Sequence, residues 1–280
     1  SSCRKEPLPP RLRRTRFTEP PHRTSDMRIL ALIVLFFIFT SPAHAAVAYK
    51  SGSFDSSGGS ISDCTVNAPA GLATGDLMVG YAFVRSALTF TNPTGWTQLF
   101  NSTASGGVLI TWKIATAADV SASTFTFAFT GGTDSVNSCS VQVWSGTDQT
   151  SPIDQFQAGV NGSGTGGTGT TPTLTCITPT KANTTAVIFA HGLNTTSIMT
   201  ASGYQIATDN PTWSEHLDSG GTIGTRRISM AMADASRPQT TAYGTTQLTW
   251  SGAQTQYGLA TFNIVAPTES TFAPWLFQIF

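Results

Sequence analysis

Apolar and polar residues alternate with a period of two along much of the chain from Ala46 onward. At residues 124–129 three phenylalanines alternate with Thr, Thr and Ala, which is the pattern of a half-buried β-strand. Residues 77–84 are apolar on both faces, which predicts a central strand covered on both sides. No stretch has a helical period of any length. With about ten or more short strands between Gly- and Pro-containing turns, the sequence predicts an all-β protein and favours a β-sandwich.

The second half of the chain repeats the pattern of the first half. The strands predicted at residues 76–83, 110–117, 125–129 and 140–144 recur in the same order at residues 185–192, 228–235, 246–250 and 259–264. Each half can form a small sandwich of its own, or the two halves can combine into one. A half with about four or five strands is marginal for burying both faces of a sheet. We therefore favour one jelly-roll β-sandwich built from two pseudo-repeated antiparallel halves.

The N-terminal region follows a different pattern and is excluded from this fold. Met27 opens a short basic start and an apolar run at residues 29–39, and Ala43-His44-Ala45 is an A-x-A cleavage site. The run is shorter than the ~20 residues that cross a bilayer, so we favour a cleaved signal peptide over a signal anchor. The expected segments are an upstream or disordered region at 1–26, a signal peptide at 27–45, the sandwich domain at 46–266 and an aromatic tail at 267–280. Cleavage after Ala45 predicts a secreted or surface protein whose mature form has no membrane span.

Composition and charge narrow the possible partners. Charged residues make up 11% of the chain, against about 25% in typical domains, whereas 17 Phe and 6 Trp can fill a core. This balance suits an extracellular or particle-surface β-protein. Residues 1–45 hold eight of the 15 Lys and Arg residues, so the rest of the chain, with seven bases and twelve acids, is mildly acidic. Because no basic stripe is visible, we do not expect a nucleic-acid partner.

Four motifs give the chain a resemblance to known proteins. They are P-x-G-L-x-x-G-D-L-M-V at residues 69–79, P-x-G-W-T at 93–97, x-W-K-I-A-T-A-A-D at 111–119 and W-S-G-T-D-Q-T-S-P-I-D at 144–154. Together they resemble β-sandwich modules of tailed-phage structural proteins and of secreted bacterial proteins. The resemblance implies a concanavalin-A-like jelly roll that binds or assembles rather than catalyses. Bacterial glucanases of that shape have an E-x-D-x-x-E strand motif, which this chain lacks, so their activity is not implied.

Three cysteines, Cys64, Cys139 and Cys176, follow the predicted signal peptide. A secreted location permits disulfides, and three cysteines allow one bond in three possible pairings. We favour Cys64 with Cys176, because each comes shortly before the first strong strand of its repeat. Three buried free thiols are the alternative. The chain has no C-x-x-C motif, so a structural zinc site is not expected.

One polar segment, residues 209–218, is the strongest candidate for a site. It is the only stretch in which an aromatic, a histidine and several carboxylates cluster, and its candidate ligand-binding residues are Asp209, Trp213, Glu215, His216 and Asp218. Trp213 can stack on a sugar ring, and the other four side chains can hold a cation such as Ca²⁺. The plain alternative is a solvated loop whose tryptophan caps the sandwich. We predict no catalytic residues, because the chain has no G-x-S-x-G nucleophile motif and any polar loop offers as many carboxylates.

These observations lead to three functional hypotheses. The first is a secreted or surface-displayed, non-enzymatic β-sandwich with a structural or adhesive role, whose partners are glycans or other surface molecules. The second is a lectin-like carbohydrate-binding domain with its site at residues 209–218. The third is a polysaccharide-degrading enzyme on the same fold, which needs two carboxyl groups about 5–10 Å apart across a cleft.

Overall fold

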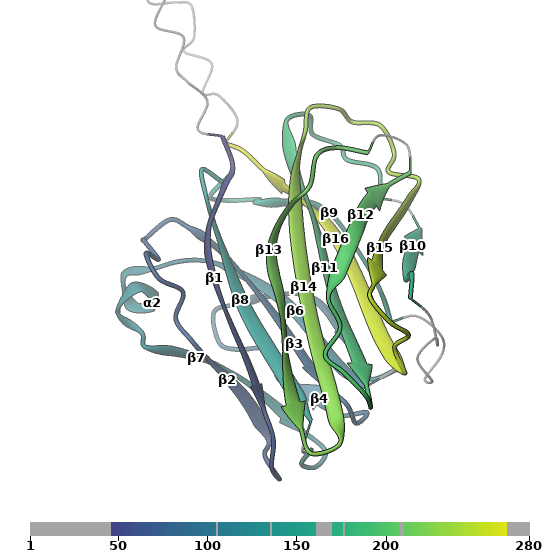
Figure 1. The fold of residues 1–280 in the computed structure, drawn as a ribbon. Coiled ribbons are helices and arrows are strands. Elements are labelled where there is room, and N and C mark those ends of the chain that lie inside the picture. Colours follow the sequence, from purple (N-terminus) through teal and green to yellow (C-terminus); the bar gives the residue numbers. More distant parts are fainter. Residues whose placement is uncertain are drawn as a thin grey trace, which may run out of the picture. The chain divides into compact units, whose positions relative to one another are not determined.

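The computed structural model describes residues 46–104, 106–134, 136–160, 170–175, 177–207 and 210–267. Within these ranges the chain forms four antiparallel sheets and one short helix, α2 (Ala117–Ser121) (Figure 1). The all-β class and the sandwich architecture predicted from the sequence are confirmed. No helix in these ranges is long and apolar enough to cross a membrane. The predicted signal peptide and the tail beyond residue 267 lie outside the described residues.

The first half of the fold contains eight strands in two sheets. Its strands are β1 (Ala48–Ser57), β2 (Asp63–Asn67), β3 (Leu77–Val84), β4 (Thr89–Phe90), β5 (Thr97–Ser102), β6 (Gly107–Ile114), β7 (Thr124–Thr130) and β8 (Asn137–Ser145). The large sheet has the order β1-β8-β3-β6-β5, and the small sheet has the order β2-β7-β4. This alternation of strands between two sheets is the jelly-roll order.

The second half repeats this arrangement strand for strand. Its strands are β9 (Ile153–Val160), β10 (Thr173–Thr175), β11 (Thr184–Asn194), β12 (Ala201–Ile206), β13 (Ser214–Ile223), β14 (Arg226–Arg237), β15 (Thr245–Trp250) and β16 (Gln256–Val265). The large sheet has the order β9-β16-β11-β14-β13, and the small sheet has the order β10-β15-β12. Each strand of the first half therefore has its counterpart eight strands later. The predicted β-sandwich of two pseudo-repeated antiparallel halves is confirmed, and each half contains the complete strand order of a jelly roll.

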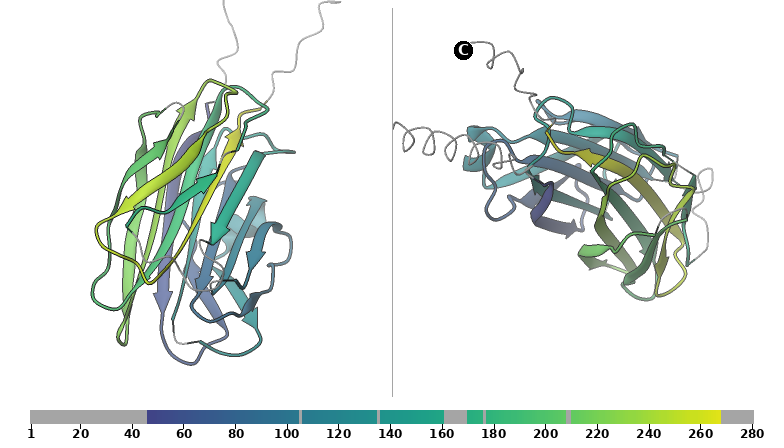
Figure 2. Two further views of the ribbon diagram at one scale, coloured as in Figure 1. Left: turned by 90° about the vertical axis from the view of Figure 1, so that its right-hand side faces the viewer. Right: turned by 90° about the horizontal axis from the view of Figure 1, so that it is seen from above.

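The two jelly rolls pack through their large sheets, which explains why β3 and β11 are apolar on both faces. Tyr81 of β3 stacks on Phe189 of β11 with ring centroids 5.2 Å apart, and two residues further along both strands Phe83 stacks on His191 at 4.0 Å. These side chains belong to a central core that draws on both large sheets. The opposite faces of the large sheets pack against the small sheets in two further cores, one in each half. The result is four layers, a small, a large, a large and a small sheet (Figure 2).

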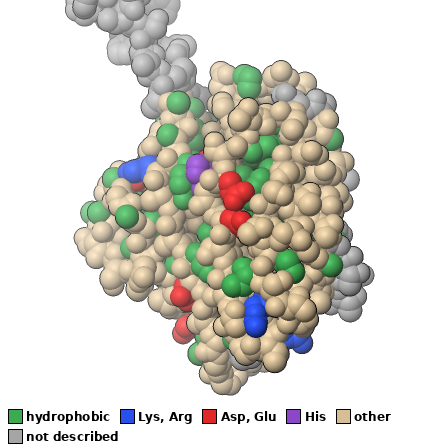
Figure 3. Space-filling model, viewed as in Figure 1, with side chains coloured by type: hydrophobic (Ala, Val, Ile, Leu, Met, Phe, Trp, Pro, Cys, Tyr) green, Lys and Arg blue, Asp and Glu red, His purple; other side chains and the backbone are tan. Residues whose placement is uncertain are grey.

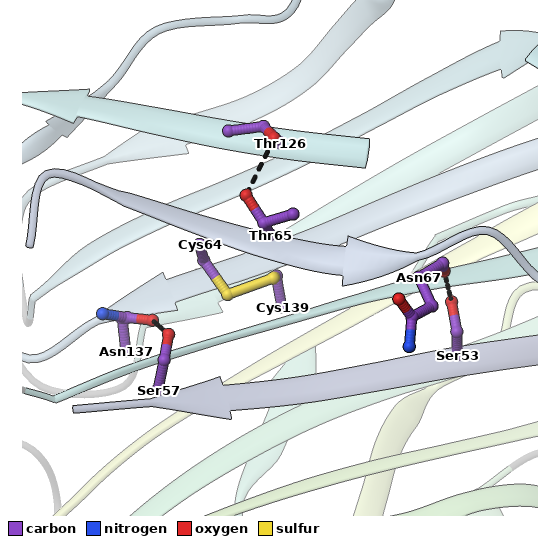
Figure 4. Close-up of a disulfide and its surroundings, with 8 residues drawn as sticks. All are labelled: Ser53, Ser57, Cys64, Thr65, Asn67, Thr126, Asn137 and Cys139. Carbon is purple, nitrogen blue, oxygen red and sulfur yellow. Dashed lines mark hydrogen bonds between the residues drawn. A yellow bond between two sulfur atoms is a disulfide. The ribbon is translucent and has the colours of Figure 1, made fainter. Parts of the chain in front are cut away.

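A disulfide joins the two sheets of the first jelly roll. Cys64 of β2 is bonded to Cys139 of β8 across the core of that half (Figure 4). The predicted pairing of Cys64 with Cys176 is therefore wrong, and Cys176 lies outside the described residues. The physical reason is the topology. Equivalent positions of a repeat lie in different jelly rolls, so the partner of a residue in β2 must come from the large sheet that β2 covers.

Candidate functional site

A β-bulge in β13 determines how the candidate side chains are arranged. This strand is the free edge of the second large sheet and pairs only with β14. Glu215 lies opposite Ala233, but Leu217 already lies opposite Met232 and Asp218 opposite Ala231, so one extra residue is inserted. In a regular strand, residues three apart point to opposite faces. The bulge instead turns both carboxylates, Glu215 and Asp218, toward the small sheet of the second half.

Two aromatic rings accompany these carboxylates. Tyr204 of β12 and Trp213, which precedes β13, lie with ring centroids 6.2 Å apart. The indole Nε1 of Trp213 donates a 3.4 Å hydrogen bond to Asn210. The backbone N–H of Ala201 donates to Asp218 Oδ1 at 3.2 Å, which ties β12 to the edge strand. We call Tyr204, Trp213, Glu215 and Asp218 the carboxylate–aromatic patch.

The electrostatics of this patch are unfavourable for two ionised carboxylates. Partial burial and the neighbouring charge of Asp218 raise the pKa of Glu215, although its hydrogen bond with the Tyr204 hydroxyl opposes the shift. Partial burial also raises the pKa of Asp218, although its hydrogen bond from Ala201 opposes the shift. Burial, the negative charges of both carboxylates and a hydrogen bond with Glu215 raise the pKa of the Tyr204 hydroxyl. Acidic side chains and a histidine are visible on the face from which β13 is seen (Figure 3). The carboxylates of Glu215 and Asp218 therefore repel each other at neutral pH.

His216, the bulge residue, points to the other side of β13, into the seam between the two halves. Its ring stacks on Tyr49 of β1 with centroids 3.8 Å apart, and its Nε2 lies 3.0 Å from Asp234 Oδ1. Trp144 of β8 donates to the other oxygen of Asp234 at 2.8 Å. Burial and the charge of Asp234 raise the pKa of Tyr49 to about 12. These four side chains link the jelly rolls across the seam.

The five residues predicted as one site are thus divided. The structure brings Trp213, Glu215 and Asp218 together and places His216 on the opposite face, while Asp209 lies outside the described residues. Sequence reasoning missed Tyr204. The repeat gives no signal for it, because the counterpart of Trp96 is Trp213: each tryptophan stands two residues before the equivalent residues Gln98 and Glu215.

The first jelly roll has a matching bulge with neutral side chains. In its edge strand β5, Gln98 lies opposite Thr111 and Phe100 already lies opposite Ile110. The residues equivalent to Glu215 and Asp218 are Gln98 and Asn101. Asn101 Nδ2 donates to Gln98 Oε1 at 3.4 Å and to the Phe90 carbonyl of β4 at 2.7 Å. The bulge and its tie to the small sheet therefore form without any charge.

The acidic residues in the motifs at residues 69–79 and 111–119 stabilise the fold. Asp76 accepts hydrogen bonds from Lys50 at 2.7 Å and from the backbone of Ala73 at 2.8 Å. Asp119 accepts bonds from Lys113 and from both the backbone and the hydroxyl of Thr116. These charged side chains fasten loops next to β3 and α2. The motifs at residues 69–79 and 111–119 are therefore explained by structure without a ligand.

The described residues place no metal centre beside the patch. No group of three or more His, Cys, Asp or Glu side chains that could hold a metal ion occurs in the described part of the chain. A cation here would be held by two carboxylates, and the calcium site stays a prediction. An open hollow of about 390 Å³ lies at the far end of β13, lined by Ser56, Gly58, Gly59, Thr222, Ile223 and Gly224. None of these side chains is acidic or basic.

Comparisons with protein-family models, with curated proteins and with solved structures found no match. The class of protein is therefore described here by its fold and by the patch. The chain is an all-β protein of two face-to-face jelly rolls, and the edge strand of the second bears a carboxylate–aromatic patch.

Proposed function

We propose that this chain is a secreted or surface-displayed, non-enzymatic β-sandwich with an adhesive or structural role. The disulfide between Cys64 and Cys139 supports an oxidising, extracytoplasmic location, as the signal-like segment at residues 27–45 does. The resemblance to modules of phage structural proteins and secreted bacterial proteins supports a role in binding or assembly.

One observation carries the binding role. In the second jelly roll, two carboxylates that repel each other lie beside a half-buried tryptophan. At the equivalent positions the first jelly roll forms the same bulge with two amide side chains. The fold does not require that charge, so we assign the charge to a ligand. Both carboxylates come from one edge strand rather than from opposite walls of a cleft, which favours binding over glycoside hydrolysis.

A lectin-like carbohydrate-binding domain is the second candidate, and Trp213 favours it. Its side chain is partly exposed although it packs against the apolar clusters of the second half, so it can contact a sugar ring at the surface. The neighbouring carboxylates can accept hydrogen bonds from sugar hydroxyl groups.

The test is a binding screen of the mature chain against a glycan panel and intact cell surfaces. Trp213→Ala should weaken binding about tenfold or more, since a stacked aromatic contributes on the order of 1–2 kcal/mol. Val120→Ala, which alters an exposed side chain of the first half, is the matched control and should bind like the wild type. Binding that survives Trp213→Ala would contradict the patch as the site. Release of reducing sugar from a polysaccharide panel would replace the proposal with the enzymatic alternative.

A further inference from the structure

The two jelly rolls face each other through equivalent residues. When the bulges of β5 and β13 are aligned, the strand pairings match Tyr81 of β3 with Phe189 of β11, and Phe83 with His191. These same pairs stack across the central core, with ring centroids 5.2 Å and 4.0 Å apart. An interface at which each residue contacts its own counterpart is the isologous interface of a symmetric dimer. The chain is therefore built like a homodimer whose two subunits are joined in one polypeptide.

The same symmetry relates the two edges of this interface. At one edge β1 lies against β13, and Tyr49 stacks on His216. At the other edge β5 lies against β9, and the rings of Phe100 and Phe156 have centroids 6.3 Å apart. Because β9 is the counterpart of β1 and β5 is the counterpart of β13, a true homodimer would have the same side chains at both edges. We call these edges the β1–β13 seam and the β5–β9 seam.

The two seams differ in their chemistry. The β1–β13 seam contains a polar cluster, in which Asp234 lies 3.0 Å from His216 Nε2 and accepts a 2.8 Å hydrogen bond from Trp144. Its counterparts at the β5–β9 seam are all apolar or aromatic and pack against the central core. For Tyr49, Trp144, His216 and Asp234 they are Ile153, Ile264, Leu99 and Trp112. Apolar side chains are thus sufficient to close such a seam, and closure alone does not explain the polar cluster.

Only a first half and a second half together complete the polar cluster. Trp144 belongs to the first half and is fully buried, whereas Asp234 belongs to the second half. In a pair of two first halves, Trp144 would face Trp112 and its indole N–H would be buried without an acceptor. In a pair of two second halves, Asp234 would face Ile264 and lose its donor. Each mismatch would occur at both seams of a symmetric pair, and leaving a buried polar group unpaired is costly.

We infer that the central face of each half is a self-complementary interface, and that the polar cluster directs the first half to the second half rather than to a second copy of this chain. The partner that this face fits is a jelly roll of the same kind. Pairing between like halves of different molecules would link chains into open polymers, because each chain has two such faces. The cluster favours closure within one molecule. This inference concerns assembly and does not depend on what the carboxylate–aromatic patch binds.

The experiment cleaves the mature chain between its halves and lets the halves choose partners. A protease recognition sequence is inserted after Thr150, in the exposed loop between β8 and β9, and the folded chain is cleaved there. The disulfide lies within the first half and does not join the halves. The cleaved chain is unfolded in denaturant without reductant and refolded, and its pairs are counted by native mass spectrometry. Mixed pairs should exceed pairs of like halves by about tenfold or more.

Two variants test the role of the cluster. His216→Leu/Asp234→Leu gives the second half an apolar seam, so pairs of two second halves should increase by about tenfold. Trp144→Phe removes the indole donor and keeps an aromatic ring, and it should reduce the excess of mixed pairs by about tenfold. Gln247→Leu makes a polar-to-apolar change on the outer face of the second half. It is the matched control and should pair like the wild type.

Three results would overturn the inference. Mixed and like pairs in equal amounts in the wild type would show that the halves do not discriminate. An unchanged excess of mixed pairs in both variants would assign the discrimination to contacts other than the polar cluster. Cleaved halves that do not pair at all after refolding would show that the central face is not an interface in its own right.

Discussion

The two edge strands β5 and β13 have the same backbone and different chemistry. Each pairs with one neighbour, each has a bulge at the same position, and each is tied to the small sheet of its own half. In β5 the bulge presents Gln98 and Asn101, which bond to each other. In β13 it presents Glu215 and Asp218, which repel each other. The comparison teaches that the backbone geometry follows from the repeat, whereas the charge is specific to one copy.

The interiors of the two halves differ in the same way. In the first half a disulfide joins β2 to β8 through the core. In the second half the counterparts of those strands, β10 and β16, place Leu174 and Leu259 in one apolar cluster. The contact between the small and the large sheet is thus made by a disulfide in one half and by apolar side chains in the other. Variants can test the two contacts separately.

Loss of the disulfide should have the largest effect. The bond spans 75 residues, and removing a native disulfide from a small domain costs about 2–5 kcal/mol of unfolding free energy. Cys64→Ala/Cys139→Ala should show this loss in a denaturant titration, and the stability of the variant should no longer respond to reductant. Mass mapping of unreduced peptides that linked Cys64 to Cys176 would contradict the structure.

The buried histidine at the seam should make stability depend on pH. Burial lowers the pKa of His191 from 6.5 to about 3, so the native state holds a neutral ring that shares a 2.7 Å hydrogen bond with the Tyr81 hydroxyl. The unfolded chain binds a proton below about pH 6.5 and the native state does not. The stabilising contribution of the buried His191 is therefore complete above pH 6.5. As the pH falls from 6.5 toward 3, the free energy of unfolding decreases by about 1.4 kcal/mol per pH unit.

His191→Phe isolates this effect. The variant should be less stable at neutral pH, because Tyr81 loses its partner, but its stability should fall less steeply between pH 6 and pH 4. Denaturant titrations at several pH values provide the measurement. Parallel pH profiles for the variant and the wild type would mean that His191 is not buried in the central core.

The contact between the large sheets should appear as a smaller coupling energy. Tyr81 and Phe189 come from different halves and stack in nearly parallel planes. A double-mutant cycle with Tyr81→Ala and Phe189→Ala should give a coupling of about 0.5–1.5 kcal/mol. Additive effects would indicate that the two halves do not face each other through β3 and β11.

The class of fold was predictable because alternation and repetition are local properties of the sequence. The residue-by-residue match between the strands of the two halves was not predictable. Aligning residues 76–83 with 185–192 matches Tyr81 with Ala190, yet Tyr81 faces the central core and Ala190 the core of the second half. A slip of one residue reverses every side chain in a strand. The alignment of Phe127 with Leu248 matched side chains that both face the core within their own half.

The candidate site was predictable in part. Its carboxylates and Trp213 are adjacent in sequence, so composition alone found them. The separation of His216 from Glu215 and Asp218 depends on a bulge, and no residue in β13 identifies that bulge beforehand. Tyr204 comes from another strand, and only the fold brings it to the patch. The disulfide depends on topology in the same way, because Cys139 lies in the strand that β2 covers.

The comparison of β5 with β13 rests on one claim, that the carboxylate pair serves a ligand and not the fold. Stability, and affinity for the glycan or cell surface that the binding screen identifies, measured together on Glu215→Gln/Asp218→Asn test it directly. The account predicts that the variant gains up to about 0.5 kcal/mol at neutral pH, since exposed charges contribute little, and that it loses at least tenfold in affinity. A clear loss of stability with unchanged affinity would show that the pair is structural, and would contradict the account.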